Sequence, residues 1–320
     1  MFENLKIIKL KNRTLLKIKG KDSKKFLQSI VTNNIDLISK DRSIYSALLS
    51  PQGKYLYDFF LFLESKENYI IMDCEKIFHE ELIHKLNIYK LRSNVEITLK
   101  DETDTYAIYG SDLSKLISIL KIKNNEGCTK NISDNLLFID PRNRNLGLRV
   151  YSNNLLKEFN SLSKGILSEW DYIRIKYGIP HPCSDLVKEK SFIIENNFEQ
   201  INAIDFTKGC YVGQENTARQ KYRGTAKRKL VVAKIIGKDI SNGERIFIDN
   251  KAVGTVRSSS LGICLVSINT VIYENLKNNN ITINVKNSEL EFIEATYFLF
   301  LPELQLILQL ELGKVSKIHN

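Results

Sequence analysis

The chain has 320 residues, of which 43% are apolar and 26% charged, and its formal net charge is +10. This length suggests two or three packed units, and the composition excludes a disordered or fibrous chain. No run of about 18 apolar residues occurs, so a membrane-spanning helix is not expected. Lysine far outnumbers arginine, and a compositional bias toward Lys, Ile and Asn explains the net charge as readily as binding of phosphate groups does.

Strands and helices intermix in residues 1–150. Residues 55–63 are so apolar that both faces of their strand are expected to be covered. No strict alternation of strand and helix is visible, so the predicted fold class is α+β. Strands are expected at 5–11, 14–19, 44–49, 55–63, 69–72, 95–99, 106–109, 136–139 and 146–150, and helices at 22–31, 75–91 and 112–122, with Ile77, Phe78, Leu82, Leu86 and Tyr89 as the inner face of the second helix.

The rest of the chain divides near residue 228. Residues 154–178 are expected to be mostly helical and 181–200 to form a loop, so 151–228 is a helical and loop region. Beyond it, short strands separated by glycine turns predict a small β-barrel or sandwich over 229–300. These strands are expected at 230–236, 245–248, 253–256, 263–272 and 281–285. Residues 301–320 receive no assignment.

The five cysteines argue for reduced thiols. They are Cys74, Cys128, Cys183, Cys210 and Cys264, and the two nearest in sequence are 27 positions apart. This spacing argues against a disulfide framework and against a zinc or iron–sulfur site held by this chain alone. The first residues also lack the pattern of a signal peptide. We therefore expect a cytoplasmic protein.

One segment combines a cysteine, two glycines and a basic run. Gly209 and Gly213 flank Cys210, and glycine permits a left-handed backbone or the close approach of another group. Lys208 could favour the thiolate form of Cys210, which is the reactive and metal-binding form. Seven basic residues and one acid, Glu215, lie between 208 and 229. The alternative is that Cys210 is a small structural residue and the glycines serve a turn.

The segment Lys208-Gly209-Cys210-Tyr211-Val212-Gly213-Gln214-Glu215, with Arg219 and Arg223 after it, resembles the signature of the YgfZ/GcvT folate-binding family. It is most similar to the YgfZ branch, which includes mitochondrial iron–sulfur assembly factors. Weaker similarity covers roughly residues 5–300 and includes Pro51-Gln52-Gly53 and Asp140-Pro141-Arg142.

The resemblance implies a multi-domain fold in which α+β units and a C-terminal β-barrel surround a central folate channel, with residues 1–150 as a folate-binding region. It also implies a role in assembling or repairing iron–sulfur clusters in client enzymes, among them a radical-SAM tRNA methylthiolase. The implied cofactors are tetrahydrofolate or a related folate and a [2Fe-2S] or [4Fe-4S] cluster. One cysteine cannot hold a cluster, so a partner such as an A-type iron–sulfur carrier would supply the other ligands.

Several residues receive roles from this reading. Cys210 is the expected reactive thiol and shared cluster ligand, with Lys208 beside it. Asp58 could serve as a base or charge stabiliser, although a structural carboxylate is the simpler interpretation. Glu195 is assigned to the pterin of folate, and Arg223 and Arg228 to its glutamate tail or to a nucleic-acid phosphate.

Two other functions stay open. A tetrahydrofolate-dependent aminomethyl or one-carbon transferase would use Asp58, but the transferase branch carries paired acids where this chain has Tyr57-Asp58. The basic run at 208–229 could also contact tRNA weakly as an accessory property. We expect an assembly factor rather than an enzyme. His181 and Cys183 are two residues apart and could be two ligands of a metal ion, but no further ligand lies nearby in the sequence.

Overall fold

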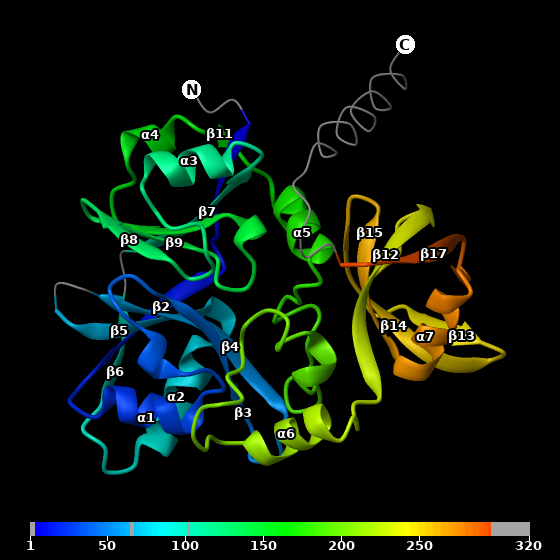
Figure 1. Ribbon diagram of the computed structural model, residues 1–320, viewed down its shortest axis with the longest axis horizontal. Coiled ribbons are helices and arrows are strands. Elements are labelled where there is room, and N and C mark those ends of the chain that lie inside the picture. The colour runs from blue at the N-terminus through cyan, green and yellow to red at the C-terminus, as the bar shows by residue number, and fades with distance from the viewer. Residues whose placement is uncertain (1–3, 65–66, 101–102, 296–320) are drawn as a thin grey trace.

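A computed structural model describes residues 4–64, 67–100 and 103–295. Three β-sheets account for most of it, and a central segment of helices and loops lies among them (Figure 1). The expected tail at 301–320 lies outside the described residues. The mixed α and β content confirms the predicted fold class.

The first sheet has five antiparallel strands in the order β3-β4-β5-β2-β6. Every residue of β4 from Tyr55 to Leu63 is buried, which confirms that both faces of this strand are covered. Two helices pack on one face, where their apolar side chains join one core cluster with the sheet. The elements are β2 (Arg13–Lys19), β3 (Ile44–Leu49), β4 (Tyr55–Glu64), β5 (Tyr69–Glu75), β6 (Glu96–Lys100), α1 (Ser23–Ile30), α2 (His79–Lys90), and the 3-10 turns Ile35–Leu37 and Lys76–Phe78.

The second sheet has the order β11-β1-β7-β10-β9-β8, with only β1 and β11 parallel among its described pairs. Its helices cover the face that is turned away from the first sheet (Figure 1). The elements are β1 (Leu5–Lys9), β7 (Asp104–Gly110), β8 (Thr129–Ile132), β9 (Asn135–Ile139), β10 (Leu148–Ser152), β11 (Ser163–Lys164), α3 (Leu113–Ile119), α4 (Lys157–Asn160), and the 3-10 turn Arg144–Leu146.

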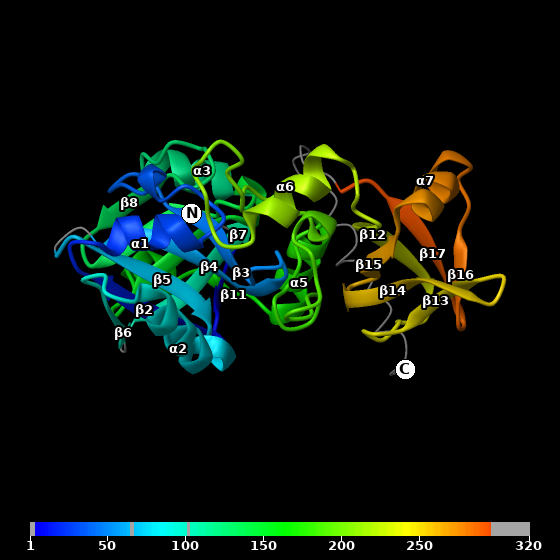
Figure 2. The same ribbon diagram turned by 90° about the horizontal axis from the view of Figure 1, so that it is seen from below.

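The third sheet has the order β13-β14-β15-β12-β17-β16 and curls into a nearly closed barrel, because its two edge strands come near each other. Its interior holds a separate apolar core. Figure 2 shows this barrel at one end of the molecule. The elements are β12 (Arg228–Gly237), β13 (Arg245–Ile248), β14 (Lys251–Ser260), β15 (Ile263–Asn269), β16 (Ile283–Val285), β17 (Ser288–Ile293) and α7 (Thr270–Asn278).

The central segment joins the three sheets. It contains α5 (Leu167–Lys176), the 3-10 turn Ile194–Asn196 and α6 (Gln214–Tyr222). One large apolar core combines side chains of both N-terminal sheets, of α5 and of the outer barrel face, where Leu230 and Leu265 lie. Asp185 reinforces this junction, because its buried carboxylate accepts hydrogen bonds from the Arg174 guanidinium and from the Ser258 amide and hydroxyl.

Three sequence-based predictions of local structure are wrong. Residues 154–178 are only partly helical, because α4 and α5 are separated by the short strand β11. Residues 270–272 begin helix α7 (Thr270–Asn278) rather than end a strand, because the Asn269 side chain caps the amides of Val271 and Ile272. Ile77 is 77% exposed, because α2 begins only at His79 after a 3-10 turn that changes the direction of this side chain.

Candidate functional site

The signature segment forms an exposed loop that leads into α6. Cys210 and Gly209 are exposed, whereas Lys208 and Tyr211 on either side of them are buried. The loop is thus held at two buried side chains and presents the thiol between them. Figures 1 and 2 show α6 at the surface, between the N-terminal sheets and the barrel.

Gly213 fixes the path of the chain after the cysteine. It has φ +82°, and a Cβ atom placed on it would lie 2.5 Å from the Ser50 carbonyl oxygen. Gly53, in the turn between β3 and β4, has φ +73° and would meet Gly213 and Asn216 in the same way. The two glycines therefore allow the signature and the Pro51-Gln52-Gly53 turn to pack backbone against backbone. Gly209 needs neither property, since no atom lies within 4 Å of its added Cβ and its φ is not positive.

Lys208 attaches the loop to the segment that follows helix α1. Its ammonium donates hydrogen bonds of 2.6 Å to the Val31 carbonyl and 2.8 Å to the Asn33 carbonyl. It also lies 5.2 Å from the centre of the Tyr211 ring. Burial lowers the pKa of Lys208 to about 8. The geometry gives Lys208 a positioning role, and its predicted effect on the thiolate stays a prediction.

Helix α6 and its C-cap residue, Arg223, carry the remaining signature residues. Glu215, Arg219 and Arg223 are exposed, and Gln214 at the first position is half-buried. Thr217 and Gln220 form the buried side of the helix. Tyr211 is buried, and burial raises the pKa of its hydroxyl to about 12.

Asp58 lines a cavity of about 820 Å³ between the N-terminal sheets, α5 and the barrel. Its buried carboxylate accepts a hydrogen bond of 3.1 Å from the Tyr55 hydroxyl. Burial raises the pKa of Asp58 from 3.8 to about 6, and the positive charges of Arg13 and Arg142 limit this rise. A carboxyl group with this pKa can both accept and release a proton near neutral pH.

A buried charge network forms the wall of this cavity, and the sequence reasoning did not identify it as part of a site. Arg13 contacts Asp73 and Glu75 at 2.7 Å each, and Arg149 contacts Asp73 at 3.0 Å. Arg142, which also lines the cavity, pairs with Asp140. The available signal was the presence of Asp73 and Arg149 inside otherwise apolar strands, because buried charges require partners.

A second cavity of about 700 Å³ is a neighbour of the first, since Tyr45 lines both. Asp205, Phe206 and Thr207 line it, so it reaches the residues that precede Lys208. Cys210 lines neither of these cavities. The structure therefore places Asp58 and Cys210 in separate locations rather than in one centre.

The three residues assigned to folate lie apart from the Asp58 cavity. The Glu195 carboxylate accepts hydrogen bonds of 3.0 and 3.1 Å from the amides of Lys227 and Arg228, where β12 begins. The Arg228 guanidinium donates to the hydroxyl and carbonyl of Ser267. Arg223 is exposed after the last turn of α6. Their roles toward folate stay predictions.

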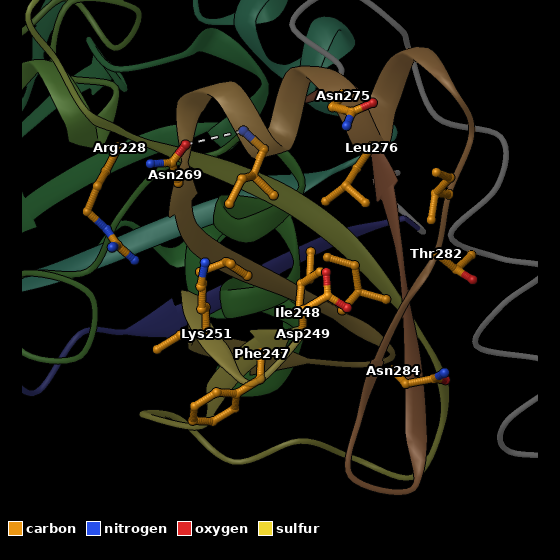
Figure 3. Close-up of a pocket in the computed structure, with 15 residues that line it drawn as sticks. Arg228, Phe247, Ile248, Asp249, Lys251, Asn269, Asn275, Leu276, Thr282 and Asn284 are labelled. Carbon is orange, nitrogen blue, oxygen red and sulfur yellow. Dashed lines mark hydrogen bonds between the residues drawn. The ribbon is translucent and has the colours of Figure 1, made fainter.

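Arg228 also lines a groove of about 780 Å³ on the barrel. Figure 3 shows α7 above the groove and Phe247, Asp249 and Lys251 along the opposite side. The groove opens between the edge strands β13 and β16, and half-exposed apolar side chains such as Phe247 and Ile281 contribute to it. It contains none of the other predicted site residues.

No group of three or more His, Cys, Asp or Glu side chains suitable for a metal ion occurs within the described residues. His181 and Cys183 are joined through the Cys183 amide, which lies 3.2 Å from His181 Nδ1. Burial raises the pKa of the Cys183 thiol to about 11, so this thiol is protonated at neutral pH. Within the described ranges, no helix is both long and apolar enough to cross a membrane.

Curated relatives share the name of an iron–sulfur cluster assembly factor. The chain is 30% identical over 238 residues to the mitochondrial IBA57 homolog of Neurospora crassa, covering 70% of this chain and 52% of that protein. It is 28% identical to human mitochondrial IBA57, covering 69% of this chain and 64% of the human protein. Mouse IBA57 is 26% identical over 312 residues, which is 90% of this chain and 82% of the mouse protein. The matched region thus spans about half to two thirds of the first relatives' length.

The fold has a close counterpart among solved structures. The crystal structure of the glycine cleavage system aminomethyltransferase T from Bartonella henselae superposes with a TM-score of 0.72. The match covers 91% of this chain and 85% of that chain, at 11% sequence identity. No family model matches the chain. The predicted GcvT-like fold with a C-terminal barrel is confirmed.

The expected cytoplasmic location is wrong. The cysteine content indicated only a reducing compartment, and the relatives are named as mitochondrial proteins, which points to mitochondria. Sequence and fold agree as far as they reach: the chain is similar to mitochondrial proteins named IBA57, and it has the fold of aminomethyltransferase T.

Proposed function

We propose that this protein assembles or repairs iron–sulfur clusters and that the Cys210 thiolate is one ligand to the cluster in transit. The observation that carries the proposal is the geometry of the signature loop, which presents one exposed thiol between two buried anchors, Lys208 and Tyr211. The similarity to proteins named as IBA57 assembly factors supports it. The signature also favours the YgfZ branch of the family.

The number of ligands that an iron–sulfur cluster needs implies that a partner protein takes part. A [2Fe-2S] or [4Fe-4S] cluster takes four protein ligands, usually cysteine thiolates. Because the described residues include no group of three metal-binding side chains, most ligands would come from a second protein. We propose an A-type iron–sulfur carrier for that partner, and iron–sulfur enzymes, including a radical-SAM tRNA methylthiolase, as clients. Weak contact of the basic run with tRNA stays an accessory proposal.

The cavity around Asp58 suits a folate. Its volume of about 820 Å³ falls in the range of sites for ligands of that size. Phe60 and Trp170 provide apolar walls, and Asp58 and Arg142 provide groups that could pair with the polar edge of a pterin. Glu195 would need to share or release its two backbone hydrogen bonds to bind a pterin.

The test is anaerobic reconstitution with an A-type carrier, followed by visible absorption and size-exclusion chromatography. Wild type should form a heterocomplex with a cluster chromophore, and Cys210→Ala should lose the chromophore. Cys183→Ala is the matched control, because Cys183 is also an exposed cysteine but lies outside the signature. Equal chromophores in wild type and Cys210→Ala would contradict the proposed role of this thiol.

A second candidate rests on Asp58. A buried carboxyl group with a pKa of about 6 on a ligand-sized cavity suits proton transfer in a tetrahydrofolate-dependent aminomethyl or one-carbon transfer. Such an activity would give turnover with tetrahydrofolate that Asp58→Asn abolishes and Cys210→Ala leaves unchanged. Absence of turnover in the purified wild type would count against this candidate.

A further inference from the structure

The outward side of α6 carries a row of exposed charged and aromatic side chains directly after the cysteine loop. Glu215, Arg219 and Tyr222 are exposed and follow one another at intervals of four and three residues, so they share one side of the helix. The exposed C-cap residue Arg223 comes four positions after Arg219 and continues this side. We refer to these four residues as the α6 stripe. The opposite side, with Thr217 and Gln220, is buried.

The two arginines of the stripe are not neutralised within the part of the chain that the structure describes. Neither Arg219 nor Arg223 forms an ion pair there, whereas Lys221 on the inner side of α6 pairs with Glu199. Lys227, which follows the helix, is likewise exposed and outside any ion pair among those residues. Because the charges of these two arginines are not used in ion pairs among the described residues, both guanidinium groups are available to a binding partner.

Tyr222 adds an aromatic contact to the stripe. Its side chain is 68% exposed, and its ring packs edge-on against Phe206 with 6.0 Å between ring centres. The Lys221 ammonium lies 3.8 Å from the centre of the Phe206 ring and supports it from within. Tyrosine and arginine, together with tryptophan, are enriched among the energetically dominant contacts of protein interfaces.

Glu215 distinguishes a protein partner from a nucleic acid. It lies at the first turn of α6, close in sequence to Cys210, and would repel a phosphate backbone that ran along the stripe. A protein can instead place acidic groups over Arg219 and Arg223 and a basic group over Glu215. Such a charge pattern fixes one orientation of the partner along the helix.

We propose that the α6 stripe is the docking surface for the protein that supplies the remaining cluster ligands, and that this partner presents acidic side chains to Arg219 and Arg223. This inference rests on the proposed function, and it adds the surface and its charge pattern. Because the stripe begins within a few residues of Cys210, a partner seated on it has its own ligands near the thiol.

The experiment measures binding of the apo form of an A-type carrier at low and high salt. The double variant Arg219→Glu/Arg223→Glu should weaken binding at least about tenfold at low salt, which corresponds to about 1.4 kcal/mol. The control Lys234→Glu/Lys251→Glu makes the same change of charge at exposed positions of the barrel and should bind within about twofold of wild type. Far-ultraviolet circular dichroism verifies that both variants are folded.

Three outcomes separate the docking surface from the cluster function. If the stripe variant binds the carrier as wild type does and still forms the chromophore, the docking proposal fails and the cluster function stands. If Cys210→Ala binds the apo carrier with wild-type affinity, and the stripe variant does not, the docking surface is supported whether or not a cluster forms. If wild type binds tRNA through the stripe but no carrier, the proposal of a protein partner is overturned.

Discussion

Replacing Gly213 by alanine is expected to destabilise the fold and displace the cysteine loop. The added methyl group would lie 2.5 Å from the Ser50 carbonyl oxygen and 3.0 Å from Gly53 Cα. Both neighbours are backbone atoms of the turn between β3 and β4, so they cannot rotate away as the end of a side chain could. The backbone must therefore move on one side or the other.

The size of the effect follows from two costs. A left-handed backbone at φ +82° costs an alanine about 1 kcal/mol or more relative to glycine. Forcing a methyl group into a packed site adds about 1–3 kcal/mol. The sum is about 3 kcal/mol, which lowers the Tm by about 4–5 °C in a protein of 320 residues.

Gly209→Ala is the matched control, because its methyl group would meet no atom within 4 Å and its φ is not positive. Thermal and urea unfolding followed by circular dichroism should show a loss for Gly213→Ala and a change within about 0.5 kcal/mol for Gly209→Ala. Equal stability of the two variants would refute the packing of the signature against the turn. The cluster chromophore should fall with Gly213→Ala only.

Three more predictions concern buried charges. Asp58→Asn should raise the free energy of unfolding at pH 7.5 by about 2–3 kcal/mol. The reason is that the pKa of Asp58 is about 6 in the folded protein and 3.8 as the ordinary value, so the wild type loses stability as pH rises from about 4 through 6. Urea titrations at several pH values should show that the gain vanishes below pH 4. The stability of the wild type should rise between pH 8 and 10, because the pKa of Lys208 is lowered from 10.5 to about 8 in the folded protein and the unfolded chain therefore holds more protons in that range. Lys208→Met should abolish this rise. A wild-type stability that does not change between pH 8 and 10 would disprove the prediction. Asp185→Ala should lower the free energy of unfolding by about 3 kcal/mol, because Arg174 and Ser258 lose their shared buried acceptor. The control Asp239→Ala, at an exposed site on the barrel, should change the stability measured by calorimetry little.

The strands were predictable where a long apolar run requires burial on both faces, as in β4. Helix α6 was missed because Gln214 to Tyr222 is polar nearly all round and offers no apolar period. Its buried residues are Thr217 and Gln220, and packing of the whole molecule makes it a helix. Helix α7 was missed for the opposite reason, because Val271 and Ile272 continue an apolar strand pattern, although Asn269 was a readable cap signal.

Individual residues of the candidate site could be predicted from the sequence, but their positions relative to one another could not. Asp58 was visible as a single acid within an apolar strand, and Cys210 as a thiol between two glycines. That they occupy separate locations depends on how the sheets meet the central segment, which no local pattern encodes. Lys208 was read as a neighbour of the thiol, but its long side chain reaches back to Val31 and Asn33.

The bonds of Lys208 also set the order in which the protein can mature. The ammonium lies 177 and 175 positions along the chain from its two acceptors. During synthesis, about 10 to 30 s separates the appearance of these acceptors from that of the lysine. Both carbonyl groups are therefore synthesised long before the lysine that binds them, and the cysteine loop can be seated only after both parts of the chain exist. Correct display of Cys210 thus depends on the folded position of the segment with Val31 and Asn33, so a molecule misfolded there would not offer this thiol in its working position.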